Sequence, residues 1–233
     1  MIINIPVFQQ CILCGHCTTA EIALCTECAL DLPCPDCVCK RCGIDLGPAP
    51  PMHGYCGLCL SEPPSFDRCI AGFSYEFPIR ELIAEFKFHA GFAEGRTLAR
   101  LLAERAERAF ETGGKPQRLL PVPLHVSRLR ERGFNQSIEV ARVIGQHCGI
   151  AVDTTYCRRS RATPSQKGLS AAERAVNLRH AFTLHGACAE GKLRHVAIVD
   201  DVVTTMTTVD TLARVLRSAG VARIDVLCLA RVS

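Results

Sequence analysis

The distribution of cysteines constrains this chain more than any other feature of its sequence. Of its 16 cysteines, 12 fall between Cys11 and Cys69, and the other four stand singly at positions 148, 157, 188 and 228. A length of 233 residues allows one or two domains. We therefore expect a cysteine-rich module over residues 1–62 and a second domain over 66–233, with the Pro-rich segment SEPPSFD at 61–67 as the boundary.

Whether such cysteines form disulfides or bind metal depends on the cellular compartment of the protein. The N-terminus has no basic start followed by a long apolar run and a small-residue cleavage site, so the chain carries no pattern of a secretory signal. No stretch approaches the roughly 20 apolar residues that a membrane helix requires. We expect a cytoplasmic protein without a membrane span, where the reducing environment favours metal binding by clustered thiols over disulfides.

Repeated C-x-x-C pairs predict two structural zinc ions held in a double zinc ribbon. Such a turn lets two thiolates reach one tetrahedral ion, and a glycine after the second cysteine helps the chain turn back. Gly15 and Gly43 occupy that position, whereas the competing pairs that end at Cys17 and Cys37 lack it. The expected ligands are Cys11, Cys14, Cys25 and Cys28 for one ion, and Cys39, Cys42, Cys56 and Cys59 for the other.

Other arrangements of the thiols stay open. Cys17, Cys34, Cys37 and His16 are acceptable substitutes in either set. Thiols without metal are disfavoured, because unrelated cysteines would not repeat the spacing. Four thiolates leave no position for substrate, so each ion would stabilise the fold of a module with few large apolar residues.

After residue 66, short apolar runs alternate with amphipathic stretches, which predicts an α/β fold with a parallel sheet flanked by helices. One helix is expected over 127–147, and the strongest strand over His195 to Val199. A helix starting near Thr207 is expected to end at Gly220 as its C-cap.

The segment HVAIVDDVVTTMTT at 195–208 has the features of a phosphate site. An apolar strand ends at Asp200 and Asp201, whose carboxylates can accept hydrogen bonds from vicinal hydroxyls. The Thr-rich turn then leads into a helix N-terminus, where free N–H groups and the helix dipole favour phosphate. For this motif alone, a strand-end turn with aspartate as helix cap is the competing interpretation.

Four apolar residues, two acids and a Thr-rich turn resemble the 5-phosphoribosyl-1-pyrophosphate (PRPP) motif of type I phosphoribosyltransferases. The whole chain resembles the ComF family, also called ComF/GntX. The resemblance rests on the C-x-x-C pairs, LPVPLHVSRLRERGFNQS at 119–137, RATPSQKGLSAAERAVNLRHAF at 161–182 and the aspartate pair, in this order.

This resemblance implies a type I phosphoribosyltransferase-like domain preceded by a zinc-ribbon module, with PRPP and Mg²⁺ as ligands. The implied PRPP-binding residues are Asp200, Asp201, Thr204, Thr205, Met206, Thr207 and Thr208. The implied pyrophosphate and basic side consists of Pro123, His125, Arg128, Arg130, Arg132, Gln136 and Lys167. Arginine suits this place because it binds phosphate oxygens bidentately.

Met206 departs from the family, which usually has glycine in this turn. Glycine lets the backbone approach a phosphate and adopt positive φ, so methionine is expected either to weaken binding or to point outwards. No catalytic residue can be assigned from the sequence, and turnover is therefore left open.

The resemblance implies a competence-associated protein that handles incoming single-stranded DNA or its nucleotides, with competence proteins as partners. Its basic segment, with Phe134 or Tyr156 for stacking, would then follow the strand. That segment contains Arg158, Arg159, Arg161, Lys167, Arg174 and Arg179 against one acid, Glu173. Its competing interpretation is a solvated basic face. A phosphoribosyltransferase of nucleotide metabolism and a non-catalytic PRPP sensor are the other two functions left open.

Overall fold

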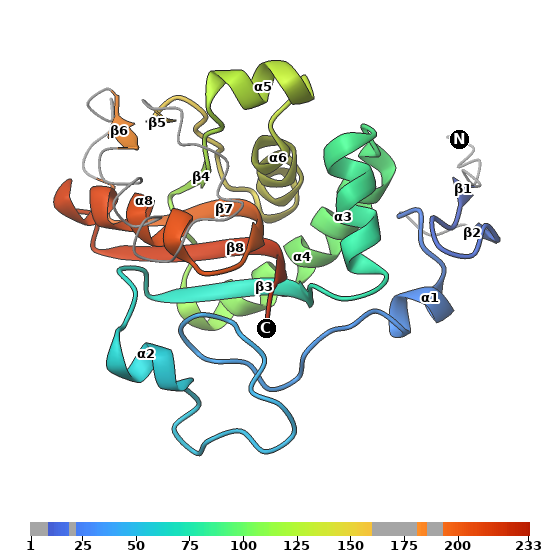
Figure 1. Ribbon diagram of the computed structural model, residues 1–233, viewed down its shortest axis with the longest axis horizontal. Helices are drawn as coiled ribbons and strands as arrows, with labels where there is room; N and C mark the ends of the chain where they lie inside the picture. The colour runs from blue at the N-terminus through green and yellow to red at the C-terminus, as the bar shows by residue number, and fades with distance from the viewer. Residues whose placement is uncertain (1–8, 19–21, 160–180, 186–192) are drawn as a thin grey trace, which may run out of the picture.

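The computed structural model describes residues 9–18, 22–159, 181–185 and 193–233. It contains the predicted parallel sheet of four strands in the order β3-β8-β7-β4 (Figure 1). These strands are β3 (Arg68–Ser74), β8 (Arg223–Arg231), β7 (His195–Val203) and β4 (Arg118–Pro121). Every neighbouring pair is parallel, which confirms the α/β fold class.

Helices cover both faces of this sheet. One face carries α3 (Ile79–Phe88), α4 (Phe92–Gly113) and α6 (Gln136–Cys148), and the other carries α8 (Thr207–Ser218). Residues of β7 alternate between them: Ala197 and Val199 pack on the α4 and α6 side, and Ile198 packs on the α8 side. A central strand buried on both faces needs an almost continuous apolar run, which is the pattern in the sequence.

The helix expected over 127–147 is two helices, α5 (Val126–Arg132) and α6. Gly133 lies in the left-handed region at φ +79° and ends α5, and Asn135 then caps α6 by accepting the N–H of Ser137. Two further bounds differ from expectation. Strand β7 continues to Val203, and α8 ends at Ala219 as its C-cap rather than at Gly220.

The cysteine-rich segment contains only short elements. These are β1 (Gln9–Gln10) paired with β2 (Cys17–Thr18), α1 (Thr26–Leu30) and α2 (Gly57–Ser61). A second small antiparallel pair, β5 (Cys157–Arg159) with β6 (Phe182–Leu184), lies beyond α6 in the chain. Within the described residues, no helix combines the length and the apolar character that crossing a membrane would take.

Several backbone contacts join this segment to the sheet. The carbonyl of Arg41 accepts the N–H of Cys69 at 2.7 Å, and the carbonyl of Pro33 accepts the N–H of Ser74 at 2.9 Å. Phe66, inside the expected boundary segment, is fully buried. The two parts therefore share an interface along β3, while their division into domains at 62 and 66 stays a prediction.

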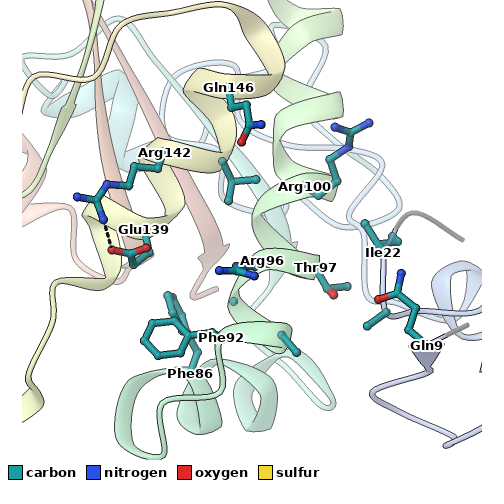
Figure 2. Close-up of a pocket in the computed structure, with 14 residues that line it drawn as sticks. Gln9, Ile22, Phe86, Phe92, Arg96, Thr97, Arg100, Glu139, Arg142 and Gln146 are labelled. Carbon is teal, nitrogen blue, oxygen red and sulfur yellow. Dashed lines mark hydrogen bonds and ion pairs between the residues drawn. The ribbon is translucent and has the colours of Figure 1, made fainter. Parts of the chain in front are cut away.

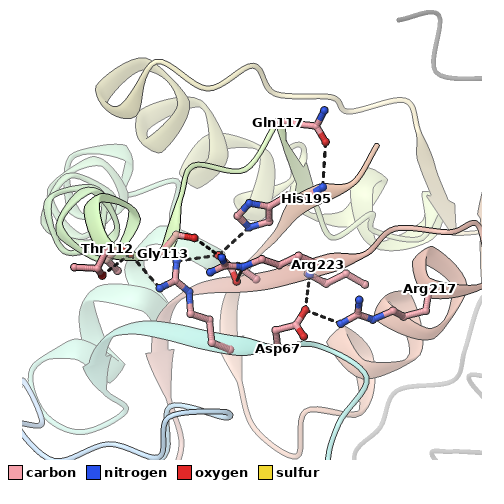
Figure 3. Close-up of polar contacts among 11 residues, drawn as sticks. Asp67, Thr112, Gly113, Gln117, His195, Arg217 and Arg223 are labelled. Carbon is pink, nitrogen blue, oxygen red and sulfur yellow. Dashed lines mark hydrogen bonds and ion pairs between the residues drawn. The ribbon is translucent and has the colours of Figure 1, made fainter. Parts of the chain in front are cut away.

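A buried ion cluster lies at the amino end of the central strands. Asp225 is fully buried, and its carboxylate lies 3.0 Å from Arg68, 3.1 Å from His195 and 3.4 Å from Arg223. Figure 3 shows His195 and Arg223 converging there, with the Arg223 guanidinium also donating to the carbonyl of Gly113. Burial raises the pKa of Asp225, but hydrogen bonds from His195 and Arg68 outweigh it and hold this pKa below its ordinary value.

Candidate functional site

The opposite, carboxyl end of β7 carries the predicted phosphate-site residues. After Val203 the chain makes a turn over 204–206 and enters α8. The first hydrogen bond within that helix runs from the N–H of Asp210 to the carbonyl of Met206, so the helix itself does not use the preceding amides. The side chains of Thr205 and Thr207 bond to each other at 2.8 Å. A shallow hollow is lined by Asp200 and by residues 202–209.

Asp200 is tied to α6. Its Oδ1 accepts the hydroxyl of Ser137 at 3.1 Å and the N–H of Asp201 at 2.9 Å. Burial, followed by the neighbouring Asp201 carboxylate, raises the pKa of Asp200 from its ordinary 3.8 to about 7. This carboxyl group therefore changes charge near neutral pH.

Asp201 is tied to α3 instead. Its Oδ1 lies 3.1 Å from Nζ of Lys87, and both side chains are largely buried. The same oxygen accepts the N–H of Val202 at 2.6 Å. The sequence did not predict Lys87 or Ser137 as neighbours of the aspartates, because only the packing of α3 and α6 brings them to this edge of the sheet.

Met206 adopts the backbone conformation expected of the glycine it replaces. Its φ of +64° and ψ of −8° lie in the left-handed region, at the N-cap of α8. The side chain is only 8% exposed and packs in the core beneath α8. The second of the two expected arrangements, an outward-pointing methionine, is therefore wrong. Burial removes the apolar surface of the side chain from water, which is favourable in free energy.

The described residues among those assigned to the basic side lie on and around α5. His125 caps this helix by accepting the N–H of Ser127 at 3.2 Å. Arg132 donates to Oε1 of Gln136 at 3.1 Å, and its guanidinium lies 5.3 Å from the ring centre of Phe88. Pro123 lines a hollow of about 350 Å³ between α5, α6 and β5. Arg128 is half-buried and Arg130 is exposed.

Lys167 and most of the basic segment, residues 160–180, lie outside the described residues. Two aromatic side chains that the sequence did not single out are exposed, and one of them, Phe88, lies against Arg132. Phe88 is 65% exposed at the end of α3, and Phe92 is 40% exposed at the start of α4. By contrast, Phe134 is packed against Phe86 and Phe92, with ring centres at 5.6 and 4.9 Å.

A larger hollow of about 580 Å³ lies among α3, α4 and α6 (Figure 2). Arg96, Arg100 and Arg142 line it together with Phe86 and Phe92. Two of these charges are partly neutralised, since Arg142 lies 2.6 Å from Glu139 and Arg100 lies 3.3 Å from Glu104. This hollow is separate from the turn at 204–208, and its volume alone assigns it no ligand.

Both predicted cysteine sets are assembled. The four sulfur atoms of each set lie within 4.8 Å of one another. The Cys14 and Cys25 sulfurs are 3.7 Å apart, and those of Cys42 and Cys56 are 3.6 Å apart. Tetrahedral zinc with bonds of about 2.3 Å requires sulfur separations of about 3.8 Å, so the donor sets fit this ion.

Within the second tetrad, the backbone around Cys39 favours the thiolate form of this one thiol. Burial raises the pKa of Cys39, but N–H groups of the surrounding backbone outweigh it and lower this pKa to about 7. One of these groups, the N–H of Cys56, lies 3.3 Å from the Cys39 sulfur. Among the described residues, Cys17, Cys34, Cys37 and His16 belong to neither tetrad.

These features define a class: a parallel α/β protein with a polar, threonine-rich turn at the carboxyl edge of its sheet and, ahead of it, two four-cysteine groups that could each hold a metal ion. The chain is 36% identical to "Competence protein F" of Haemophilus influenzae, over 95% of this chain and 96% of that protein. It is likewise 36% identical to "DNA utilization protein YhgH" of Escherichia coli K12, over 89% and 90%. At this identity and coverage, the chain belongs to the ComF family, as its sequence motifs indicated.

No family model matches the chain. Among solved structures, a hypoxanthine phosphoribosyl transferase of Trypanosoma cruzi aligns with 17% identity and a TM-score of 0.40, over 60% of this chain and 74% of that one.

Proposed function

We propose that the carboxyl edge of the sheet binds PRPP. In this proposal the turn at 204–208 holds the 5′-phosphate, and Asp200 and Asp201 accept hydrogen bonds from the ribose hydroxyls. The observation that carries it is the carboxylate pair followed by a left-handed turn that opens a 12-residue helix. A helix start with unused amides, at the end of a central parallel strand, is a physically suitable phosphate site.

Magnesium would enter with PRPP and would neutralise its diphosphate. Carboxylate oxygens are the protein ligands this ion prefers. Asp200 fits this role, because a nearby cation would lower its raised pKa and keep it ionised. Arg128 and Arg130, on α5, are then available to the diphosphate.

We further propose that this protein acts in DNA uptake and handles the incoming single strand or its nucleotides, as the names of its relatives suggest. Support comes from the exposed rings of Phe88 and Phe92 beside the guanidinium groups of Arg132 and Arg96. Bases stack on aromatic rings while arginines contact phosphates, which gives binding without sequence preference.

Calorimetric titration with PRPP and Mg²⁺ tests the nucleotide site. The double variant Asp200→Asn, Asp201→Asn should bind at least about tenfold more weakly, since a hydrogen bond to a charged group contributes roughly 1.5–3 kcal/mol. Glu104→Gln on α4 is the control, because it removes a carboxylate from a half-exposed ion pair instead. Equal affinity of the double variant and the wild type would refute the proposed role of the pair.

Fluorescence anisotropy with a labelled oligothymidylate tests the single-strand proposal. Phe88→Ala, Phe92→Ala should weaken binding by at least about tenfold, because stacking contributes roughly 1–3 kcal/mol per base. Phe77→Ala is the matched control, since this ring is 75% exposed before the start of α3. Affinity should also fall steeply with salt, and a loss that is the same in both variants would contradict the proposal.

The second candidate function is a phosphoribosyltransferase that joins a base to PRPP and releases pyrophosphate. The same arrangement supports it, because Asp200 and Asp201 would hold the ribose while Arg128 and Arg130 stabilise the negative charge of the departing pyrophosphate. Pyrophosphate release from PRPP and Mg²⁺ in the presence of a panel of free bases distinguishes an enzyme from a protein that only binds or senses PRPP.

A further inference from the structure

Arg231, the last residue of β8, is a buried cation with an unusual set of partners. Arg231 is only 5% exposed. Its Nε donates to the carbonyl of Cys42 at 3.1 Å, and its Nη1 donates to the carbonyls of Val203, Thr204 and Val232. No carboxylate forms an ion pair with it within the described part of the chain. A buried guanidinium normally needs a compensating negative charge.

The two ends of this contact set are the second cysteine tetrad and the phosphate turn. Cys42 is one of the four thiols of that tetrad, and Thr204 opens the turn. A zinc ion held by four thiolates gives a net charge of about −2, and the proposed ligand of the turn is a phosphate. We infer that Arg231 is a positioning residue that couples the second tetrad to the phosphate turn, so that metal and phosphate each stabilise binding of the other.

The geometry of the peptide units explains what Arg231 does to the turn. The carbonyl and the N–H of a trans peptide unit point in opposite directions. Arg231 binds the carbonyls of Val203 and Thr204, so the N–H groups of Thr204 and Thr205 point away from it. Successive N–H groups that point to one side form a concave anion site. Arg231 thus holds the turn in the form that a phosphate requires.

The tetrad end is held equally closely. Gly43 follows Cys42 with φ +68°, and a Cβ at this position would lie 2.9 Å from the carbonyl oxygen of Cys69. The chain after Cys42 therefore packs directly on β3, which pairs with β8. Loss of metal would release the Cys39–Cys42 turn and, with it, the carbonyl that positions the guanidinium.

Another arginine offers a matched control. Arg105 on α4 also joins the cysteine-rich segment to the sheet, by donating to the carbonyls of Pro35 and Gly72, each at 3.1 Å. Neither acceptor belongs to a tetrad or to the phosphate turn. Arg105→Lys and Arg231→Lys both keep the charge and both lose the guanidinium fork. They differ in what the fork holds and in burial, since Arg231 is buried and Arg105 is half-buried.

The first test needs no ligand. Hydrogen–deuterium exchange of the full chain should be faster in Arg231→Lys at residues 203–209 and at 39–43 together, by at least about fivefold, and unchanged there in Arg105→Lys. Unchanged exchange at 203–209 in Arg231→Lys would overturn the inference. Faster exchange in both variants would do the same, since it would mean general loosening of the interface.

The second test uses ribose 5-phosphate as probe and zinc release to a colorimetric chelator as readout. In the wild type and in Arg105→Lys, the probe should slow the loss of one of the two zinc ions at least about fivefold. In Arg231→Lys, the probe should leave the rate of zinc loss unchanged. The inference rests on the proposed function only for this step. If calorimetry shows no binding of the probe or of PRPP, the proposed function fails while the exchange experiment still decides the role of Arg231; binding without slower zinc loss overturns the coupling alone.

Discussion

Met206 combines a backbone conformation typical of glycine with a buried side chain. A left-handed conformation costs an ordinary L-residue roughly 1–2 kcal/mol, whereas burial of a methionine contributes about 1.5–3 kcal/mol. The family resemblance implies that glycine is usual here, but the sequence gave no sign that methionine keeps the conformation and fills the core under α8. Replacing Met206 by glycine alone would change the backbone strain and the buried apolar surface at the same time.

Comparing Met206→Gly with Met206→Ala separates them, because both remove the side chain. The glycine variant should be more stable than the alanine variant by about 1 kcal/mol, the reverse of their usual order. Both should be less stable than the wild type, owing to the lost burial. Urea denaturation measures the difference, and an alanine variant as stable as the glycine variant would mean that the turn is not left-handed in solution.

Asp200 should make the stability of the protein depend on pH near neutrality. Its folded-state pKa of about 7 lies above the ordinary 3.8, so the folded protein binds this proton more tightly than the unfolded chain. The group therefore favours folding below about pH 4, and that contribution is lost as the pH rises through 7. Asp200→Asn should be more stable than the wild type at pH 8 by roughly 1–2 kcal/mol, after allowance for weaker hydrogen bonds.

Denaturation of both proteins at pH 5 and pH 8 measures this effect. The gain from Asp200→Asn should shrink at pH 5, where the wild-type carboxyl is protonated in the folded state. A gain of the same size at both pH values would show that the raised pKa is not its source.

At the scale of elements, the sequence predicted what depends on local pattern. The apolar run over His195 to Val199 identified β7, and the helix expected from Thr207 is α8. The break between α5 and α6 was missed, because a single Gly133 in an otherwise helical pattern is also compatible with one continuous helix.

The candidate site shows the same limit. Asp200, Asp201 and the threonines lie in one segment, so their spacing was sufficient to propose them as site residues. Ser137 and Arg231 approach the site from distant parts of the chain. Ser137 is 63 residues away from Asp200 in sequence, and Arg231 is 27 residues away from Thr204. Such contacts depend on how elements pack, which the periodicity of one sequence does not contain.

The ion cluster around Asp225 should contribute strongly to the stability of the protein, because its residues lie on β3, β7 and β8 and link these strands. Asp225→Asn leaves three basic groups around a neutral side chain, and removal of one partner from a buried ion cluster costs roughly 3–5 kcal/mol. Because the pKa of Asp225 is lowered, its contribution is present above about pH 4 and is lost as the pH falls through the folded-state pKa. Glu104→Gln, in a half-exposed pair, should change stability by less than about 1 kcal/mol. Denaturation at pH 7 compares the two, and equal effects would contradict a structural role for the cluster.

At the scale of the whole molecule, the two tetrads stand in different relations to the sheet. Cys39, Cys42 and Cys59 are buried in the core that also holds Phe66 and residues of α8. In the first tetrad Cys11 is buried in the core of α3 and α4, but Cys14 is exposed and Cys25 and Cys28 are half-buried at the edge of that core. Figure 1 places this part of the chain beside α3, far from α8. We therefore expect metal at the second tetrad to support the body of the fold more than metal at the first.

Zinc analysis and melting curves of three serine variants test this difference. The wild type should contain two zinc ions per chain, and Cys59→Ser and Cys14→Ser should each contain one, because each tetrad needs all four thiolates. One kcal/mol corresponds to about 2–4 °C in a chain of this size. Cys59→Ser should lower the main transition by at least about 8 °C, since metal binding there is also folding free energy of the shared core. Cys14→Ser should lower it by less than about 4 °C, because the loss stays mostly local.

The control is Cys17→Ser, since Cys17 is exposed and outside both tetrads, and this variant should keep two ions. Loss of zinc from the Cys17 variant would show that the ligand assignment of the first tetrad is wrong, and equal melting shifts in the Cys14 and Cys59 variants would show that both centres are equally integrated into the fold.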